Sequence, residues 1–225
     1  MNNKTNKAAG APLFTAEEIE VNSSGAGENF AQNTGDNLRQ KYADSRVPII
    51  RSESEKLLIS LVSKANPSRI LEFGTAVGFS AISMLNATAG TIVTIEIDNN
   101  RANEARSNIT AAGLERRAVV LVGDDRRVAE DLVAAKEEFD FVFLDSAKGQ
   151  YINLLPNILK LLKSGGTLVA DNVLFRGYVY GDCPKRYKTI AKRLRDFIAA
   201  CKGSLDLINV KVYDVEDGVL VAVKR

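Results

Sequence analysis

The sequence predicts an α/β fold built on a doubly wound, mostly parallel sheet. Short, continuously apolar segments alternate with segments of helical periodicity, which is typical of parallel strands covered by helices on both faces. Glycines at Gly74 and Gly78 follow the first apolar segment, and strand–turn–helix units of this kind carry ligand sites in open α/β sheets. We therefore expect one domain over residues 36–225.

Five apolar segments predict parallel strands, at Arg69–Phe73, Thr91–Glu96, Ala118–Val122, Phe139–Leu144 and 167–170. The helices between and after them are expected to begin near Gly78, Asn99, Asp125, Tyr151 and Pro184. Two final segments, 206–212 and 218–223, flank a turn that ends in glycine and predict a hairpin. The sum is a seven-stranded sheet with an antiparallel edge strand.

The N-terminal part of the chain differs in composition from the rest. Residues 1–35 are rich in Asn, Ser, Gly, Ala and Thr, which predicts a flexible arm with one short helix near residues 16–21. Helical pattern starts at Asn37. Residues 52–55, Ser-Glu-Ser-Glu, fit a capping box ahead of an apolar helical stripe that Pro67 ends.

Composition narrows the chemistry that the chain can perform. The 225 residues include no histidine and two cysteines, and the net charge is +2. Acid–base work therefore falls to Lys, Asp, Glu, Tyr or Cys, and a disulfide framework or zinc site is not expected. The N-terminus has no signal-peptide core and no apolar run is long enough to span a bilayer. A cytoplasmic setting and no membrane partner are expected.

The glycine turn predicts a cofactor cradle. Glu96 ends the second predicted strand, 18 residues after Gly78 (96 − 78), where a carboxylate can accept hydrogen bonds from ribose hydroxyls. The spacing G-x-x-x-G, with Ala76 in the middle, favours a nucleoside cofactor without phosphates over a dinucleotide. Glu72 within an apolar strand needs a partner, which the ammonium of an amino-acid moiety would supply. The alternative is an ordinary strand–turn–helix with a solvated Glu96.

A second group of polar residues follows two later strands. Asp145 comes directly after one, Asp171 and Asn172 directly after the next, and Lys148 lies three residues beyond Asp145. Two carboxylates and an amide oxygen are hard ligands suited to Mg²⁺, and a lysine beside a divalent cation can act as a base. The alternatives are aspartates that cap the segments after them and a solvated loop lysine.

Two further features leave alternatives open. Asp124 and Asp125 follow the third strand, where an adenine edge would lie, but Asp125 can equally cap the next helix. A basic helix in the last quarter of the chain is usually a solvated amphipathic helix and could also contact phosphates. Its cations are Lys185, Arg186, Lys188, Lys192, Arg193 and Arg195, which Arg126, Arg127 and Arg176 would extend.

These motifs together resemble the Mg²⁺-dependent, S-adenosylmethionine (SAM)-dependent O-methyltransferases of the catechol and caffeoyl-CoA type. The motifs are residues 69–81 (RILEFGTAVGFSA), 144–151 (LDSAKGQY) and 171–177 (DNVLFRG), and the resemblance runs from Val47 to the C-terminus. Residues 47–50 (VPII) and the last two motifs are most similar to the bacterial branch that includes the tRNA 5-hydroxyuridine methyltransferase, which makes 5-methoxyuridine at the wobble position.

The resemblance implies a Rossmann-like class I SAM methyltransferase that forms a homodimer. It makes Asp145, Asp171 and Asn172 the metal ligands, and Lys148 the catalytic base beside Asp145. The implied cofactor-binding residues are Glu72, Gly74 and Ser80 around the methionine part, Glu96 at the ribose, Asp124 and Asp125 at the adenine, Ile50 through its backbone, and Asp145. The chain departs from the family in its longer N-terminal arm, and in Ser146 and Ala147, which replace bulkier residues of the catechol enzymes.

The leading functional hypothesis is methylation of 5-hydroxyuridine in a tRNA anticodon loop, and the alternative is a small catechol-like or caffeoyl-type acceptor. Both acceptors offer two neighbouring oxygens to a metal ion, so the motifs do not separate them. A non-catalytic RNA-binding module is a rival of another class. An NAD-dependent oxidoreductase is disfavoured by the missing middle glycine.

Overall fold

The computed structural model describes residues 38–42 and 49–225. Residues 38–42 are helical, as expected from the pattern that starts at Asn37. The predicted arm over residues 1–35 and its short helix near 16–21 lie outside the described residues. Within the described part, no helix is long and apolar enough to cross a membrane.

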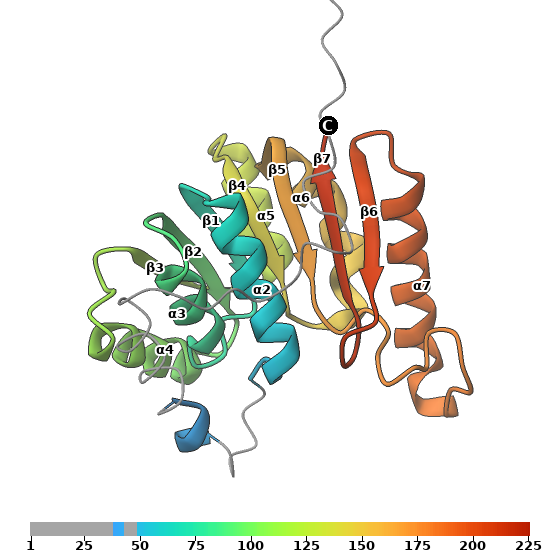
Figure 1. Ribbon diagram of the computed structural model, residues 1–225, viewed down its shortest axis with the longest axis horizontal. Coiled ribbons are helices and arrows are strands. Elements are labelled where there is room, and N and C mark those ends of the chain that lie inside the picture. The colour runs from blue at the N-terminus through green and yellow to red at the C-terminus, as the bar shows by residue number, and fades with distance from the viewer. Residues whose placement is uncertain (1–37, 43–48) are drawn as a thin grey trace, which may run out of the picture.

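A seven-stranded sheet forms the centre of the molecule (Figure 1). Its order is β3-β2-β1-β4-β5-β7-β6, and only β7 runs antiparallel to its neighbours on both sides. This confirms the predicted doubly wound sheet with an antiparallel edge. The strands are β1 Arg69–Phe73, β2 Thr91–Glu96, β3 Ala118–Val122, β4 Phe139–Leu144, β5 Leu162–Ala170, β6 Leu207–Tyr213 and β7 Val219–Lys224.

Helices cover both faces of the sheet (Figure 1). The helices α2 Ser52–Ala65, α3 Phe79–Asn86 and α4 Asn99–Ala111 pack in sequence on one face. The other face carries α5 Asp125–Ala134, α6 Tyr151–Leu161 and α7 Lys188–Gly203. Two single 3₁₀ turns, Lys148–Gln150 and Lys185–Tyr187, precede α6 and α7.

Each face of the sheet has its own hydrophobic core. Along β1, Ile70 belongs to the core under α2 and α3, while Leu71 and Phe73 belong to the core under α5, α6 and α7. Side chains alternate between the faces of a strand, so Glu72 shares the face of Ile70. The sequence thus places one buried carboxylate beneath α3.

Three local predictions were wrong. The capping box over residues 52–55 does not form, because Arg51 is the N-cap of α2 and no side chain caps it. Glu55 instead binds Arg39 at 2.6 Å and Ser83 at 2.7 Å, and Glu216 accepts the backbone N–H of Ser54 at 3.0 Å. The strand predicted at 167–170 begins earlier, at Leu162. The last helix begins at Lys188, after the 3₁₀ turn.

The carboxyl ends of β1, β4 and β5 lie in register at one edge of the sheet. The N–H of Asp145 donates to Phe73 O at 2.9 Å, and the N–H of Asp171 donates to Leu144 O at 3.0 Å. Gly74 lies against this junction with φ +99°, and a Cβ there would sit 2.3 Å from Asp145 O. The loops after the three strands therefore share one crevice.

We expect Gly74→Ala to destabilise the fold more than Gly113→Ala. Both positions have positive φ, but nothing lies within 4 Å of a Cβ at Gly113. The control should lose about 1 kcal/mol from its backbone conformation alone. The clash should cost Gly74→Ala roughly 1–3 kcal/mol more. Urea unfolding measures both variants, and equal losses would contradict the close approach.

Candidate active site

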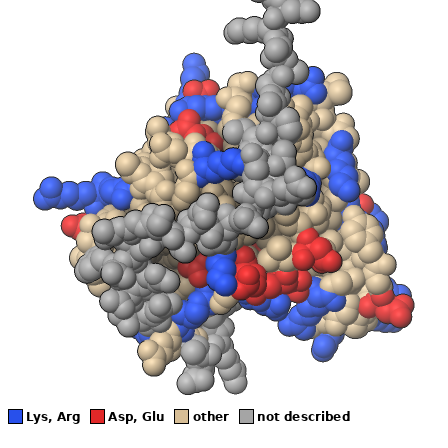
Figure 2. Space-filling view, viewed as in Figure 1, with Lys and Arg blue, Asp and Glu red and all other residues tan. Residues whose placement is uncertain are grey.

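One cavity of about 620 Å³ opens at the carboxyl edge of the sheet. It gathers nearly all of the predicted site residues, from loops that are far apart in the sequence. Those that line it are Ile50, Gly74, Ser80, Glu96, Asp124, Asp125, Asp145, Lys148, Asp171 and Asn172. Acidic and basic side chains lie close together on the surface around the lower end of α2 (Figure 2).

Glu96 is fixed at the end of β2 by backbone donors. Its carboxylate accepts the N–H of Ala76 at 2.8 Å and the N–H of Asp98 at 3.0 Å. Ala76 belongs to the glycine turn and has φ +47°. Glu96 therefore braces the turn after β1 while it lines the cavity.

Glu72 does not line the cavity but lies behind it. Ser80 Oγ donates to Glu72 Oε1 at 2.5 Å, and Thr94 Oγ1 donates to Oε2 at 2.6 Å. Burial raises the pKa of Glu72 to about 7, against these two hydrogen bonds, and the charges of Asp145 and Glu96 raise it further. Two hydroxyls of the protein thus serve as partners of Glu72, and the ammonium partner expected from the cofactor stays a prediction.

The two aspartates after β3 have different surroundings. Asp124, not Asp125, is the N-cap of α5 and accepts the N–H groups of Arg126 and Arg127. Burial raises the pKa of Asp125 to about 6, and the charges of Asp124 and Glu96 add to it. The nearby Ser146 hydroxyl opposes that rise, although it lies outside hydrogen-bond geometry.

Ser146 supplies a test of whether the cavity suits a polar ligand. Its buried Oγ has no hydrogen-bond partner among the described residues, and the residue lines the cavity. Buried polar groups without partners are costly. A nucleoside cofactor with amino and hydroxyl groups in the cavity would fit this orphaned hydroxyl.

The acidic end of the cavity holds the residues predicted to bind metal. Lys148 Nζ lies 2.9 Å from Asp145 Oδ1. Asp171 is almost fully buried and accepts the N–H of Asn172 at 2.7 Å. Burial, followed by the charge of Asp145, raises the pKa of Asp171 to about 7. Beneath them, the hydroxyl of Tyr151 lies 3.1 Å from both Leu144 O and Asp171 O.

The donor set at this end fits a hard divalent cation. Within residues 38–42 and 49–225, no group of three or more His, Cys, Asp or Glu side chains is placed to hold a metal. The predicted ligand set is not a group of that kind, because it combines two carboxylates with the side-chain amide of Asn172. All its donors are oxygens, as Mg²⁺ prefers, and a cation there would offset the cost of ionising the buried Asp171.

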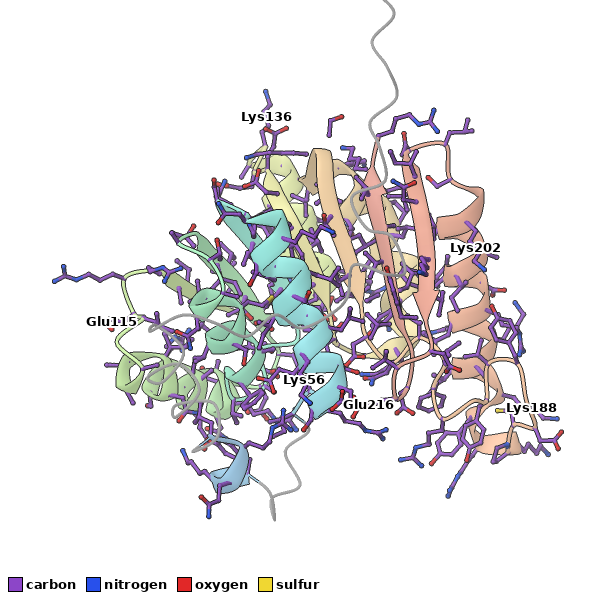
Figure 3. The ribbon with its side chains drawn as sticks, viewed as in Figure 1. Lys56, Glu115, Lys136, Lys188, Lys202 and Glu216 are labelled. Carbon is purple, nitrogen blue, oxygen red and sulfur yellow. The ribbon has the colours of Figure 1, made fainter. Side chains whose placement is uncertain are left out.

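Several cavity residues were not predicted from the sequence. Thr75, Phe79, Ile97, Arg101, Arg126 and Gln150 line it, as do Arg51 and Asp217, which form an ion pair at 3.2 Å. Asp217 belongs to the turn between β6 and β7, and its carbonyl also accepts the N–H groups of Leu174 and Phe175. Figure 3 shows the neighbouring Glu216 beside the lower end of α2. No local pattern reveals such a contact, because its members are distant in the sequence.

We expect Glu72→Gln to flatten the pH dependence of stability. Glu72 has a higher pKa in the fold than its ordinary 4.5, so the folded state holds the proton more tightly than the unfolded state does. The stability is therefore greatest below the unfolded pKa and falls as pH rises towards 7. The variant should lose this component and keep those of Asp171 and Asp125, whose pKa values are also raised.

Urea unfolding without ligand or metal, between roughly pH 5 and pH 8, measures this effect. The exposed Glu115, labelled in Figure 3, gives a control in Glu115→Gln, which should decline in parallel with the wild type. A Glu72→Gln variant that also declines in parallel would contradict the prediction.

The chain is similar to known methyltransferases over most of its length. The family model described as "O-methyltransferase" matches residues 24–225. Caffeoyl-CoA O-methyltransferase 2 of Zea mays is 30% identical over 75% of this chain and 67% of its own. Catechol O-methyltransferase of Mycobacterium tuberculosis is 29% identical over 64% of this chain and 66% of its own.

Solved structures agree with this relationship. An O-methyltransferase of Bacillus cereus in complex with SAH has a TM-score of 0.77 at 25% identity, covering 92% of this chain and 94% of its own. TomG of Streptomyces achromogenes, in complex with SAM, has a TM-score of 0.69 at 26% identity, covering 92% of each chain. The chain therefore belongs to the O-methyltransferase family of the caffeoyl-CoA and catechol type, and it is a SAM-dependent O-methyltransferase.

Proposed function

We propose that this enzyme transfers the methyl group of SAM to one of two neighbouring oxygens on a small catechol-like or caffeoyl-type acceptor, in a Mg²⁺-dependent reaction. The observation that carries the proposal is the cluster of Asp145, Lys148, Asp171 and Asn172 at one end of the cavity. The relatives named for caffeoyl-CoA and catechol support this acceptor class.

In this proposal the cofactor occupies the part of the cavity nearest the glycine turn. Ser80, Gly74 and Ile50 surround its methionine part, and Asp145 approaches it from β4. Glu96, already fixed by two backbone amides, accepts the ribose hydroxyls. Asp124 and Asp125 flank the adenine. Positioning of the sulfonium methyl against the acceptor oxygen supplies much of the rate.

The acidic end then binds and deprotonates the acceptor. Asp145, Asp171 and Asn172 would hold Mg²⁺, which supplies positive charge to stabilise an oxyanion on the acceptor. Lys148 acts in this step as the neutral amine and receives the acceptor's proton at Nζ. Asp145 holds that nitrogen in place at 2.9 Å and stabilises the ammonium that forms.

Methylation of tRNA stays a prediction, and the basic helix gives it little support. Several of its cations already have partners within the chain. Lys192 pairs with Asp196 at 2.8 Å, and Arg193 donates to Gly149 O at 3.1 Å. Arg195 donates to Val179 O, and Arg186 lies over the ring of Tyr187. The expected homodimer, the cytoplasmic setting and the domain boundary at residue 36 also stay predictions.

We expect Lys148→Ala to lower kcat by roughly 10²–10⁴-fold, the contribution typical of a positioned base. The Kd for SAM should change little, because Lys148 is proposed to act on the acceptor. Steady-state kinetics with catechol and calorimetric titration of SAM measure the two quantities. Lys202→Ala on the exposed side of α7 (Figure 3) is the control and should match the wild type. Undiminished turnover by Lys148→Ala would remove the base assignment.

The acceptor class is tested by incubating the enzyme with labelled SAM and Mg²⁺. One set of reactions contains 3,4-dihydroxyphenyl compounds and the other contains tRNA that carries 5-hydroxyuridine, and each is run with and without EDTA. We expect label in the small acceptors, which EDTA abolishes, and at least a roughly 100-fold loss in Asp171→Ala. Label in tRNA alone would move the assignment to the nucleic acid. Turnover that withstands EDTA and the Asp171 substitution would contradict metal dependence.

A further inference from the structure

A buried chain of hydrogen bonds joins two hydroxyls at the cavity wall through residues behind it. Thr75 Oγ1 and Thr94 Oγ1 lie 2.6 Å apart. Thr94 Oγ1 donates to one oxygen of Glu72, and Ser80 Oγ donates to the other. The exposed fraction is 0% for Glu72 and Thr94, 1% for Thr75 and 7% for Ser80.

The fold divides these four residues into a hidden pair and a wall pair. Glu72 and Thr94 are direct neighbours in the register of β1 and β2, and neither lines the cavity. Thr75 in the turn after β1 and Ser80 in the first turn of α3 both line it. Thr94 is therefore linked to the cavity wall by the hydroxyl of Thr75 on one side, and by Glu72 and Ser80 on the other.

When Glu72 is ionised, counting protons fixes the direction of each hydrogen bond. An ionised carboxylate only accepts, and a hydroxyl has one proton to donate. An ammonium group bound nearby favours the ionised form of Glu72. In that form Ser80 and Thr94 each donate their one proton to Glu72, and Thr75 must then donate to Thr94. The hydroxyls of Thr75 and Ser80, whose residues line the cavity, then have only lone pairs to offer a ligand.

We infer that Thr94 is a positioning residue for the cofactor: together with Glu72 it orients the hydroxyls of Thr75 and Ser80 as acceptors for the ammonium group of the amino-acid part of SAM. Two lone-pair donors with a carboxylate directly behind them suit a cation that carries N–H groups. The inference rests on the proposed placement of the methionine part near the glycine turn, and it does not depend on the acceptor or the metal.

A role in stability alone makes a different prediction. Thr94 is fully buried, so its hydroxyl needs partners wherever a ligand binds. Such a role would change the unfolding free energy of the free protein without distinguishing one ligand from another. A role in orientation changes affinity only for ligands that carry the ammonium.

The test compares two ligands in Thr94→Val, which keeps the shape of the side chain and removes its hydroxyl. S-adenosylhomocysteine carries the amino-acid part, and 5′-methylthioadenosine lacks it. We expect the Kd of S-adenosylhomocysteine to rise roughly tenfold, as for one hydrogen bond to a charged group. The Kd of 5′-methylthioadenosine should stay within about twofold of the wild-type value. Calorimetry measures both.

Three further variants sharpen the comparison. Thr94→Ser restores a hydroxyl and should recover most of the affinity for S-adenosylhomocysteine. Thr91→Val, at an exposed position on the same strand, should bind both ligands as the wild type does. In Glu72→Gln the side-chain amide must donate a hydrogen bond to one of the two hydroxyls, which reverses the direction of that bond. The affinity for S-adenosylhomocysteine should therefore fall, although the free protein gains stability at neutral pH.

An equal loss for both ligands in Thr94→Val, or no loss for either, would overturn the inference. Failure of the proposed function is separately visible, because these titrations contain neither acceptor nor metal. A wild type that binds S-adenosylhomocysteine but methylates no dihydroxyphenyl compound would refute the acceptor class and leave the inference intact.

Discussion

The backbone pairing of β1, β4 and β5 at their carboxyl ends is the constraint on which the site depends. The bonds from Asp145 N to Phe73 O and from Asp171 N to Leu144 O fix where each polar loop leaves its strand. Gly74 permits the closest of these approaches, against Asp145 O. Main-chain geometry thereby holds the cofactor cradle and the acidic cluster in one cavity.

Burying several acidic side chains at this edge of the sheet has an energetic cost, which the raised pKa values of two of them reflect. Glu72 and Asp171 both have pKa values raised to about 7, with burial as the largest cause. Cations are the natural complement of such a site, and the Nζ of Lys148 lies 2.9 Å from the Oδ1 of Asp145. Burying these carboxylates lowers the stability of the ligand-free fold, and a ligand that compensates their charge stabilises the folded state.

Much of the fold follows from local pattern, and much of the cavity from the family motifs. Four parallel strands have the predicted bounds because their apolar runs are flanked by turn residues on both sides. The start of β5 was missed because Lys163, Ser164 and two glycines interrupt its apolar pattern. The capping box does not form because Glu55 binds Arg39 and Ser83 instead. Both partners are distant in the sequence, so the local pattern does not predict these contacts. The Thr75–Thr94 contact and the Arg51–Asp217 pair depend on tertiary approach in the same way.

The position of β7 has a consequence for how the chain matures on the ribosome. It lies between β5 and β6 although it follows both in the chain. Until residues 219–224 emerge, β5 keeps an unpaired apolar edge, and such edges invite pairing with other nascent chains. The turn that delivers β7 also brings Asp217 to Arg51 and to the loop after β5. Closing the sheet and completing the cavity wall are thus one late event, so a cotranslational intermediate would be both exposed and inactive.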